Sequence, residues 1–254
     1  MKPFVSIILP NYNEYQNLKR GVLDSIAQHV ANKEYTSEVI ISDDGSTDGS
    51  LDFIETFMLS HPKFLLLKNK HAGKPFALRS AVKKAKGRYV LFTDMDQSTP
   101  IAELDKLLPY VKRGSHIVIG SRGARRVDST PIRKLASLIF LLARRAILLP
   151  RIKDTQCGFK LFETTLALDI FKHMRIFGRN NNVRGWKVTA YDVEMLFLAR
   201  KMGVGISEVQ VKWKDEDTSV DKGRNFVRES LEMFGEILRV RINDLLGKYY
   251  IVAR

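Results

Sequence analysis

Two aspartates separated by one residue, Asp94 and Asp96, end the apolar segment RYVLFTDMD at residues 88–96. In an extended chain, residues i and i+2 point to the same side, so both carboxylates can meet one cation. Two carboxylates that share Mg²⁺ or Mn²⁺ with substrate phosphates are typical of nucleotide sites, and the amide oxygen of Gln97 could be a further ligand. The alternative is a solvated acidic loop. The position at the end of a buried strand, beside other acidic strand ends, favours the metal site.

A second pair of acids, Asp43 and Asp44, stands in SDDGSTDGS at residues 42–50, again after an apolar segment. Asp43 could accept a hydrogen bond from a base N–H or a ribose hydroxyl, and Asp48 could cap the helix that follows. A simple turn with an N-cap would explain the glycine, the serine and Asp48. It does not explain two consecutive acids at a strand end, which point to a ligand.

Other motifs for phosphate binding or nucleophilic catalysis are absent from the sequence. Gly73-Lys74 has no glycine five residues earlier and is followed by Pro75, which excludes a P-loop. No GxGxxG or GxSxG is present, so a nicotinamide site and a hydrolase nucleophile elbow have no support. The only cysteine, Cys157 in DTQCGFKLF, has no histidine nearby in the sequence to activate it. We expect it to pack rather than to react.

The acids must be positioned by an alternation of strands and helices in the first half of the chain. Strands are expected at residues 4–10, 37–45, 64–69, 88–96 and 116–122, with helices at 17–30, 50–59 and 74–86 between them. This alternation predicts an α/β fold with a single Rossmann-like, mostly parallel sheet flanked by helices. Ligands bind at the carboxyl ends of the strands in such sheets, and those ends carry the acids.

The second half of the chain is less regular. A helix is expected at residues 191–203 and a strand at 206–214, and the chain ends in an amphipathic helix. We expect the apolar stripe of this last helix to pack on the protein; the alternative, suggested by Arg239 and Arg241, is that the helix lies at a membrane interface. That stripe consists of Val227, Leu231, Phe234, Leu238, Ile242 and Leu245. No repeat or low-complexity linker interrupts the chain. The sequence therefore predicts one domain at residues 1–222, followed by an amphipathic C-terminal helix extension at 223–254.

Positive charge is concentrated in residues 111–153, which hold eleven Lys or Arg and one acid in a chain of formal net charge +14. Such a block attracts nucleic acid, a phosphorylated substrate or an acidic membrane surface. Phe140 is its only aromatic residue, so no nucleic acid is expected. Residues 131–150 are either a membrane-interface helix interrupted by Arg144 and Arg145 or a core helix with two solvated arginines. No stretch reaches the ~18 apolar residues of a membrane span.

These motifs together resemble the family-2 glycosyltransferases of the GT-A fold. LPNYNE (9–14) and VIISDDGSTDGS (39–50) look like their nucleotide loops, and YVLFTDMDQSTP (89–100) looks like their metal-binding strand. Four further segments are similar to the dolichyl-phosphate glucosyltransferases and, more loosely, to the dolichyl-phosphate mannose synthases. They are GSR (120–122), DTQCGFKLF (154–162), YDVEMLFLARK (191–201) and VKWKDEDTS (211–219).

The resemblance implies roles for individual residues. It places Pro10, Tyr12, Glu14, Asp43, Asp94, Met95, Asp96 and Arg122 around the nucleotide sugar, and Asp94, Asp96 and Gln97 at the metal. Asp96, Asp154 and Arg122 would serve catalysis, although Asp154 could equally be a structural cap before the Gly158 turn. The acceptor phosphate or the membrane would meet Arg133, Arg144, Arg145 and Gln156.

Two departures from the family pattern leave phosphate contacts open. Val220 stands where the family has a lysine, so Lys222 or Arg224 could replace it. The usual GKG reads GKP at residues 73–75, which leaves the role of Lys74 undetermined.

The activity implied by the resemblance is that of an inverting glycosyltransferase that needs Mg²⁺ or Mn²⁺. It would move a hexose, with UDP-glucose the favoured donor, to a polyprenyl phosphate such as dolichyl or undecaprenyl phosphate. The enzyme would be peripheral, on the cytoplasmic face of an anionic membrane. A soluble family-2 transferase acting on a saccharide or protein hydroxyl is the alternative, and a basic nucleic-acid-binding protein is a remote one.

Overall fold

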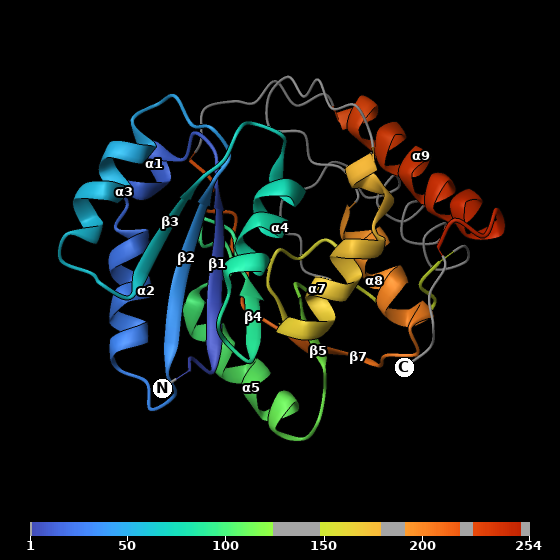
Figure 1. The fold of residues 1–254 in the computed structure, drawn as a ribbon, viewed down its shortest axis with the longest axis horizontal. Helices are drawn as coiled ribbons and strands as arrows, with labels where there is room; N and C mark the ends of the chain where they lie inside the picture. The colour runs from blue at the N-terminus through green and yellow to red at the C-terminus, as the bar shows by residue number, and fades with distance from the viewer. Residues whose placement is uncertain (1, 124–147, 179–190, 219–225, 250–254) are drawn as a thin grey trace.

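The computed structural model describes residues 2–123, 148–178, 191–218 and 226–249 (Figure 1). Its centre is a seven-stranded sheet in the order β3-β2-β1-β4-β6-β5-β7. The strands are β1 Val5–Asn11, β2 Ser37–Asp43, β3 Phe64–Lys68, β4 Tyr89–Phe92, β5 Ile117–Ser121, β6 Lys160–Glu163 and β7 Ile206–Gln210. β6 is antiparallel to β4 and β5, and the other neighbouring pairs are parallel. The predicted mostly parallel α/β sheet is confirmed.

Helices cover both faces of this sheet. They are α1 Tyr15–Leu18, α2 Val22–Ala31, α3 Ser50–Met58, α4 Lys74–Lys84, α5 Leu104–Lys112, α7 Thr164–His173, α8 Tyr191–Lys201 and α9 Phe226–Leu245, with short 3₁₀ turns at Ile101–Glu103 and Arg175–Gly178. Because strand residues alternate between faces, Ile8 of β1 packs in the core with α4, α7 and α8. Its neighbours Ile7 and Leu9 pack in the core with α2, α3 and α5.

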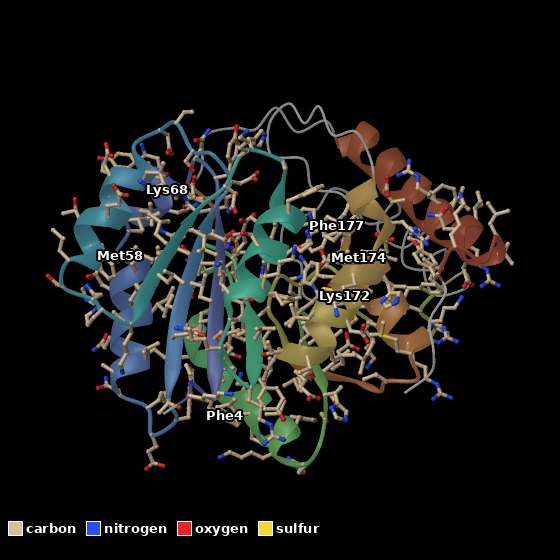
Figure 2. All side chains as sticks on the ribbon, viewed as in Figure 1. Phe4, Met58, Lys68, Lys172, Met174 and Phe177 are labelled. Carbon is tan, nitrogen blue, oxygen red and sulfur yellow. The ribbon has the colours of Figure 1, made fainter. Side chains whose placement is uncertain are left out.

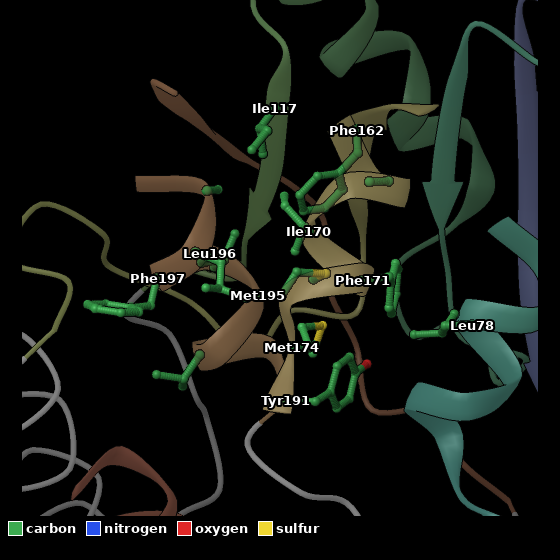
Figure 3. Close-up of a cluster of buried hydrophobic side chains, with 14 of the residues drawn as sticks. Leu78, Ile117, Phe162, Ile170, Phe171, Met174, Tyr191, Met195, Leu196 and Phe197 are labelled. Atoms are coloured by element: carbon green, nitrogen blue, oxygen red, sulfur yellow. The ribbon is translucent and has the colours of Figure 1, made fainter. Parts of the chain in front are cut away.

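The core between α4, α7 and α8 is rich in aromatic and sulfur-containing side chains. Leu78, Phe171 and Tyr191 belong to one buried cluster and point into the space that these helices share (Figure 3). Phe177, labelled in Figure 2, meets Phe76 of α4 edge to face with the ring centroids 4.9 Å apart. This packing joins the first turn of α4 to α7 and to the 3₁₀ turn at Arg175–Gly178, which matters for the lysine that opens α4.

The topology brings several polar segments to one edge of the sheet. β1, β2, β4 and β5 run in the same direction, so the residues after them share that edge. β6 runs the other way and begins there, which places the preceding segment 154–159 beside the acids that follow β4. The sequence did not predict β6, because its four residues KLFE show no clear strand period.

Three expected elements differ from those observed. The strand expected at 88–96 ends at Phe92, so Asp94 and Asp96 lie in the turn that follows it and not in an extended segment. The helix expected at residues 17–30 is two helices, because Gly21 adopts a left-handed conformation (φ 76°) that interrupts it. The strand expected at 206–214 ends at Gln210. Beyond that residue the chain leaves β5 and crosses the polar edge of the sheet.

Helix α9, drawn in red in Figure 1, has one packed face and one exposed face. Ile237 and Val240 are buried in the core. Of the apolar stripe that the sequence led us to expect as packed, Phe234 (38% exposed), Leu238 (39%), Ile242 (53%) and Leu245 (71%) face outward. Packing on the protein was therefore the wrong expectation for these four residues, and the side chains of Val227 and Leu231 lie outside those that the structure describes. None of the helices in the described ranges is long and apolar enough to cross a bilayer.

Candidate active site

The first loop of the site follows β1. Pro10 is buried in the strand, and Tyr12 stacks on His71 with the ring centroids 4.3 Å apart. The Glu14 carboxylate, also buried, accepts a 2.6 Å hydrogen bond from the Asn17 side chain. The three residues that the sequence predicted for nucleoside binding in this loop therefore lie at the polar edge, next to the ends of β2 and β3.

Asp43, at the end of β2, is fully buried and hydrogen-bonded within the chain. One carboxylate oxygen accepts the backbone N–H groups of Gly45 and Ser46 at 2.8 and 3.0 Å. The other accepts the Asn11 amide at 2.7 Å. These contacts shape the turn that follows β2, so the predicted contact between Asp43 and a nucleoside stays a prediction.

Asp44 has a structural role that the sequence did not reveal. Its buried carboxylate accepts the backbone N–H groups of Ala72 (2.9 Å) and Gly73 (2.8 Å) and contacts His71 Nδ1 at 2.9 Å. Burial raises the pKa of Asp44, although these hydrogen bonds and His71 oppose the increase. The second acid thus holds the loop from which α4 begins.

Two buried polar atoms next to these acids were missed by sequence reasoning. Asn11 Oδ1 and His71 Nε2 have no hydrogen-bond partner among the described residues. The Asn11 amide donates to Asp43 and to Ser46 Oγ, which fixes its oxygen as an acceptor. A polar residue inside the buried end of β1 was the available signal for Asn11; nothing in the sequence marked His71.

The segment after β4 contains three candidate metal ligands. Asp94 and Asp96 are partly exposed, and the side chain of Met95 between them is buried. Asp96 accepts the Ser98 N–H at 2.8 Å. The Gln97 amide nitrogen donates to the Asp94 carbonyl at 2.7 Å, whereas its Oε1 is buried without a partner among the described atoms.

These residues fit a divalent cation by their chemistry. Two carboxylates and an unsatisfied amide oxygen are the hard oxygen donors that Mg²⁺ and Mn²⁺ prefer. Within the described residues, no group of three or more His, Cys, Asp or Glu side chains is assembled around a metal position. The chain alone therefore supplies an incomplete coordination shell, which substrate oxygens could complete.

Arg122, directly after β5, is held by Asp154. Its Nε and Nη2 donate to the two carboxylate oxygens at 2.7 and 2.9 Å, and its backbone N–H adds a third bond at 3.1 Å. Burial alone would raise the pKa of Asp154, but the hydrogen bonds and charge of Arg122 lower it to about 2. Asp154 also accepts the backbone N–H groups of Gln156 and Cys157 at 3.1 and 3.2 Å. It is both the structural cap and the residue that orients Arg122.

The rest of DTQCGFKLF packs below the acids. Cys157 is 1% exposed, and burial raises the pKa of its thiol, so it is protonated at neutral pH. This confirms the expected packing role. Lys160, also 1% exposed, forms a 2.6 Å ion pair with Asp192 of α8 and donates to the Cys157 carbonyl. A fully buried lysine in this segment was not predicted.

The loop after β7 closes one side of the site. The Lys214 and Glu216 N–H groups donate to the carbonyl and hydroxyl of Ser98, next to the candidate metal ligands. Arg20 forms a 3.0 Å ion pair with Glu216 and also donates to the Asp96 carbonyl. Val220, Lys222, Arg224, Arg133, Arg144 and Arg145 lie outside the described residues, so their predicted roles stay predictions.

Replacing Asp154 with Asn should lower the free energy of unfolding at neutral pH and make it depend less on pH below about pH 4. A folded-state pKa near 2, against ~3.9 in the unfolded chain, means that the stabilisation is complete above about pH 4 and is lost as the pH falls through 2. The pair contributes about 2 kcal/mol at neutral pH. We expect denaturant unfolding from pH 7 to pH 2 to show lower stability and a shallower acid decline in Asp154→Asn. An unchanged acid slope would contradict the assignment.

Comparison with known proteins identifies relatives of this chain. The sequence profile of glycosyl transferase family 2 matches residues 6–171. The dolichyl-phosphate beta-glucosyltransferase of Dictyostelium discoideum is 32% identical over 266 residues, which cover 98% of this chain and 77% of the relative. That of Drosophila melanogaster is 33% identical over 240 residues, covering 85% and 68%.

Solved structures show the same fold at low sequence identity. Mannosyl-3-phosphoglycerate synthase from Rubrobacter xylanophilus is similar with a TM-score of 0.65 and 16% identity, covering 99% of this chain and 77% of that one. Glucosyl-3-phosphoglycerate synthase from Mycobacterium tuberculosis, solved with Mn²⁺, UDP-glucose and glycerol 3-phosphate, gives 0.61 and 18%, covering 98% and 81%. The fold is GT-A, as the resemblance implied.

Proposed function

Because the chain belongs to glycosyl transferase family 2, we propose that this glycosyltransferase moves glucose from UDP-glucose to a polyprenyl phosphate, with inversion at the anomeric carbon. The curated relatives are dolichyl-phosphate beta-glucosyltransferases, which supports glucose as the sugar and a polyprenyl phosphate as the acceptor. A structural neighbour that holds Mn²⁺ and UDP-glucose supports the donor class. Mg²⁺ and Mn²⁺ both fit the oxygen ligands of Asp94, Asp96 and Gln97.

The observation that carries the proposal is that two carboxylates near the candidate metal ligands are each ion-paired with a cation of the chain. Asp154 is paired with Arg122, and Asp192 is paired with Lys160. With a pKa of about 2, Asp154 is a weak base that would not deprotonate a sugar or protein hydroxyl. A phosphate monoester has its second pKa near ~6 and is already a nucleophile at neutral pH. The site therefore suits an acceptor that brings its own charged nucleophile.

The other residues of the site would stabilise the negative charge that develops on the leaving diphosphate. A divalent cation at Asp94 and Asp96 would neutralise charge on the departing diphosphate. Arg122, oriented by Asp154 through Nε and Nη2, would direct its remaining Nη1 toward the same charge. A single displacement on an α-linked donor gives a β-linked product, which accounts for the proposed inversion.

The proposal is tested by incubating the purified protein with Mn²⁺, labelled UDP-glucose and a short polyprenyl phosphate in detergent. We expect a labelled glycolipid whose anomeric proton shows the coupling of a β-linkage. GDP-mannose and UDP-N-acetylglucosamine should react more slowly. Turnover on a saccharide hydroxyl without any lipid product would overturn the proposal and favour a soluble transferase. An α-linked product would refute inversion.

Membrane contact is part of the proposed function, because a polyprenyl phosphate resides in a bilayer. The outward side chains Phe234, Leu238, Ile242 and Leu245 of α9 supply apolar surface, and residues 111–153 supply positive charge. Apolar side chains and basic residues are together the features of interfacial binding to anionic lipid. We propose a peripheral location on the cytoplasmic face.

Substituting both Leu238 and Ile242 with Glu should weaken partition to anionic liposomes. Burying one Leu or Ile side chain contributes about 1.5–3 kcal/mol, so the double change should reduce partition by about tenfold or more. The matched control is Leu59→Glu, because Leu59 is 87% exposed on a different helix end. Sedimentation with vesicles measures the effect. Equal partition of both variants, or partition that salt does not change, would contradict the proposed surface.

A further inference from the structure

Lys74 lies at the edge of the active site, and contacts of its backbone loop and of its side chain fix its position. It is the first residue of α4, and the loop before it is fixed because Asp44 accepts the N–H groups of Ala72 and Gly73. The Lys74 side chain is 15% exposed, and its ammonium group is ion-paired with Asp94 Oδ1. The buried Tyr191 also interacts electrostatically with this ammonium group. The Lys74 side chain is therefore held in one position, unlike a surface lysine that is free to rotate.

The surrounding charges are arranged in three pairs. Arg122 is paired with Asp154 at 2.7 Å, Lys160 with Asp192 at 2.6 Å, and Lys74 with Asp94. Within the described ranges no cation is ion-paired with Asp96. In the donor-free protein, one of the two predicted metal carboxylates is therefore already neutralised by the chain itself.

A divalent cation that arrives alone faces an unfavourable exchange at Asp94. It must displace the Lys74 ammonium, which then remains, largely buried, without its carboxylate partner; removing one partner of a buried ion pair is strongly unfavourable. Lys160 and Arg122 also act on Asp94 electrostatically and repel a further cation. A nucleoside diphosphate changes this balance, because its negative oxygens bind the cation and give Lys74 a new partner.

We propose that Lys74 is an internal counter-ion that occupies Asp94 until the nucleotide diphosphate arrives, so that metal and nucleotide bind together rather than metal first. The inference rests on the proposed function only in taking a nucleoside diphosphate as the donor group. It gives a role to the lysine whose GKP context departs from the family pattern. A cation pre-placed on Asp94 also keeps that carboxylate ordered while the site is empty.

The test measures Mn²⁺ binding directly, by the loss of the free-ion signal in electron paramagnetic resonance, with no sugar transfer involved. In the wild-type protein, pyrophosphate or UDP should strengthen Mn²⁺ binding by about tenfold or more beyond their own affinity for Mn²⁺. Lys74→Met should bind Mn²⁺ alone about tenfold more tightly than wild type and lose most of the strengthening. Lys74→Arg, which keeps the charge, should bind Mn²⁺ alone as wild type does.

Lys70→Met is the matched control, since Lys70 is an exposed lysine of the same loop, and it should behave as wild type. Wild-type Mn²⁺ binding that is equally strong with and without pyrophosphate overturns the inference. So does a folded Lys74→Met protein whose binding of Mn²⁺ alone is unchanged or weaker. If pyrophosphate strengthens Mn²⁺ binding but UDP does not, the role of Lys74 is supported and UDP-glucose as the donor is contradicted. The experiment therefore distinguishes failure of this inference from failure of the proposed function.

Discussion

Asp96→Ala should lower the rate of sugar transfer by about 10³-fold and leave the protein folded. Asp96 forms no ion pair with another described residue, and its carboxylate holds only the Ser98 N–H at 2.8 Å. Its removal therefore costs little in stability. The loss falls on the divalent cation, whose stabilisation of the leaving diphosphate amounts to several kcal/mol in such reactions.

The appropriate control is Asp52→Ala, which removes an exposed aspartate in the first turn of α3, away from the sheet edge. Both variants should unfold within about 0.5 kcal/mol of wild type, and only Asp96→Ala should lose turnover at saturating Mn²⁺. Rates are measured with labelled donor at several Mn²⁺ concentrations. Full activity of Asp96→Ala would refute the metal site at Asp94, Asp96 and Gln97.

The main features of the fold were predictable because they depend on local patterns. Apolar runs that end in acids gave β2 and β4, and their alternation with helices gave a parallel sheet. The grouping of Asp94, Asp96 and Arg122 at one edge followed from strand direction alone. The break at Gly21 was missed because the apolar stripe of residues 17–30 continues across a glycine whose φ of 76° cannot be read from sequence.

The internal partners of the site residues were not predictable, because they come from distant parts of the chain. Lys160 and Asp192 meet only after β6 inserts between β4 and β5, and the acid loop from β2 holds the loop before α4 through Asp44. Hydrophobic periodicity predicts that a face of α9 is apolar. It does not say which residues on that face find a partner, and so the exposure of Leu238 and Ile242 appeared only in three dimensions.

Gly158→Ala should lower the transfer rate by about 10²-fold or more, because Asp94 occupies the space that a side chain would need. A Cβ atom at position 158 would lie 2.0 Å from Asp94 Oδ2 and 2.6 Å from its carboxyl carbon. Gly158 does not have a positive φ, so backbone strain is not the reason for the glycine. The added methyl group must displace Asp94 from Lys74 and from its position beside Asp96.

A double-mutant cycle separates this steric effect from a general loss of stability. Gly158→Ala should destabilise the wild-type protein by about 1–3 kcal/mol, as overpacking does, but much less in an Asp94→Ala background, where the carboxylate is gone. Gly205→Ala is the control, since a Cβ there meets nothing within 4 Å. Denaturant unfolding of the four proteins of the cycle gives the coupling. Equal costs in both backgrounds would show that Asp94 is not the reason for the glycine at position 158, whereas the expected coupling ties the CGF turn directly to the carboxylate that is ion-paired with Lys74.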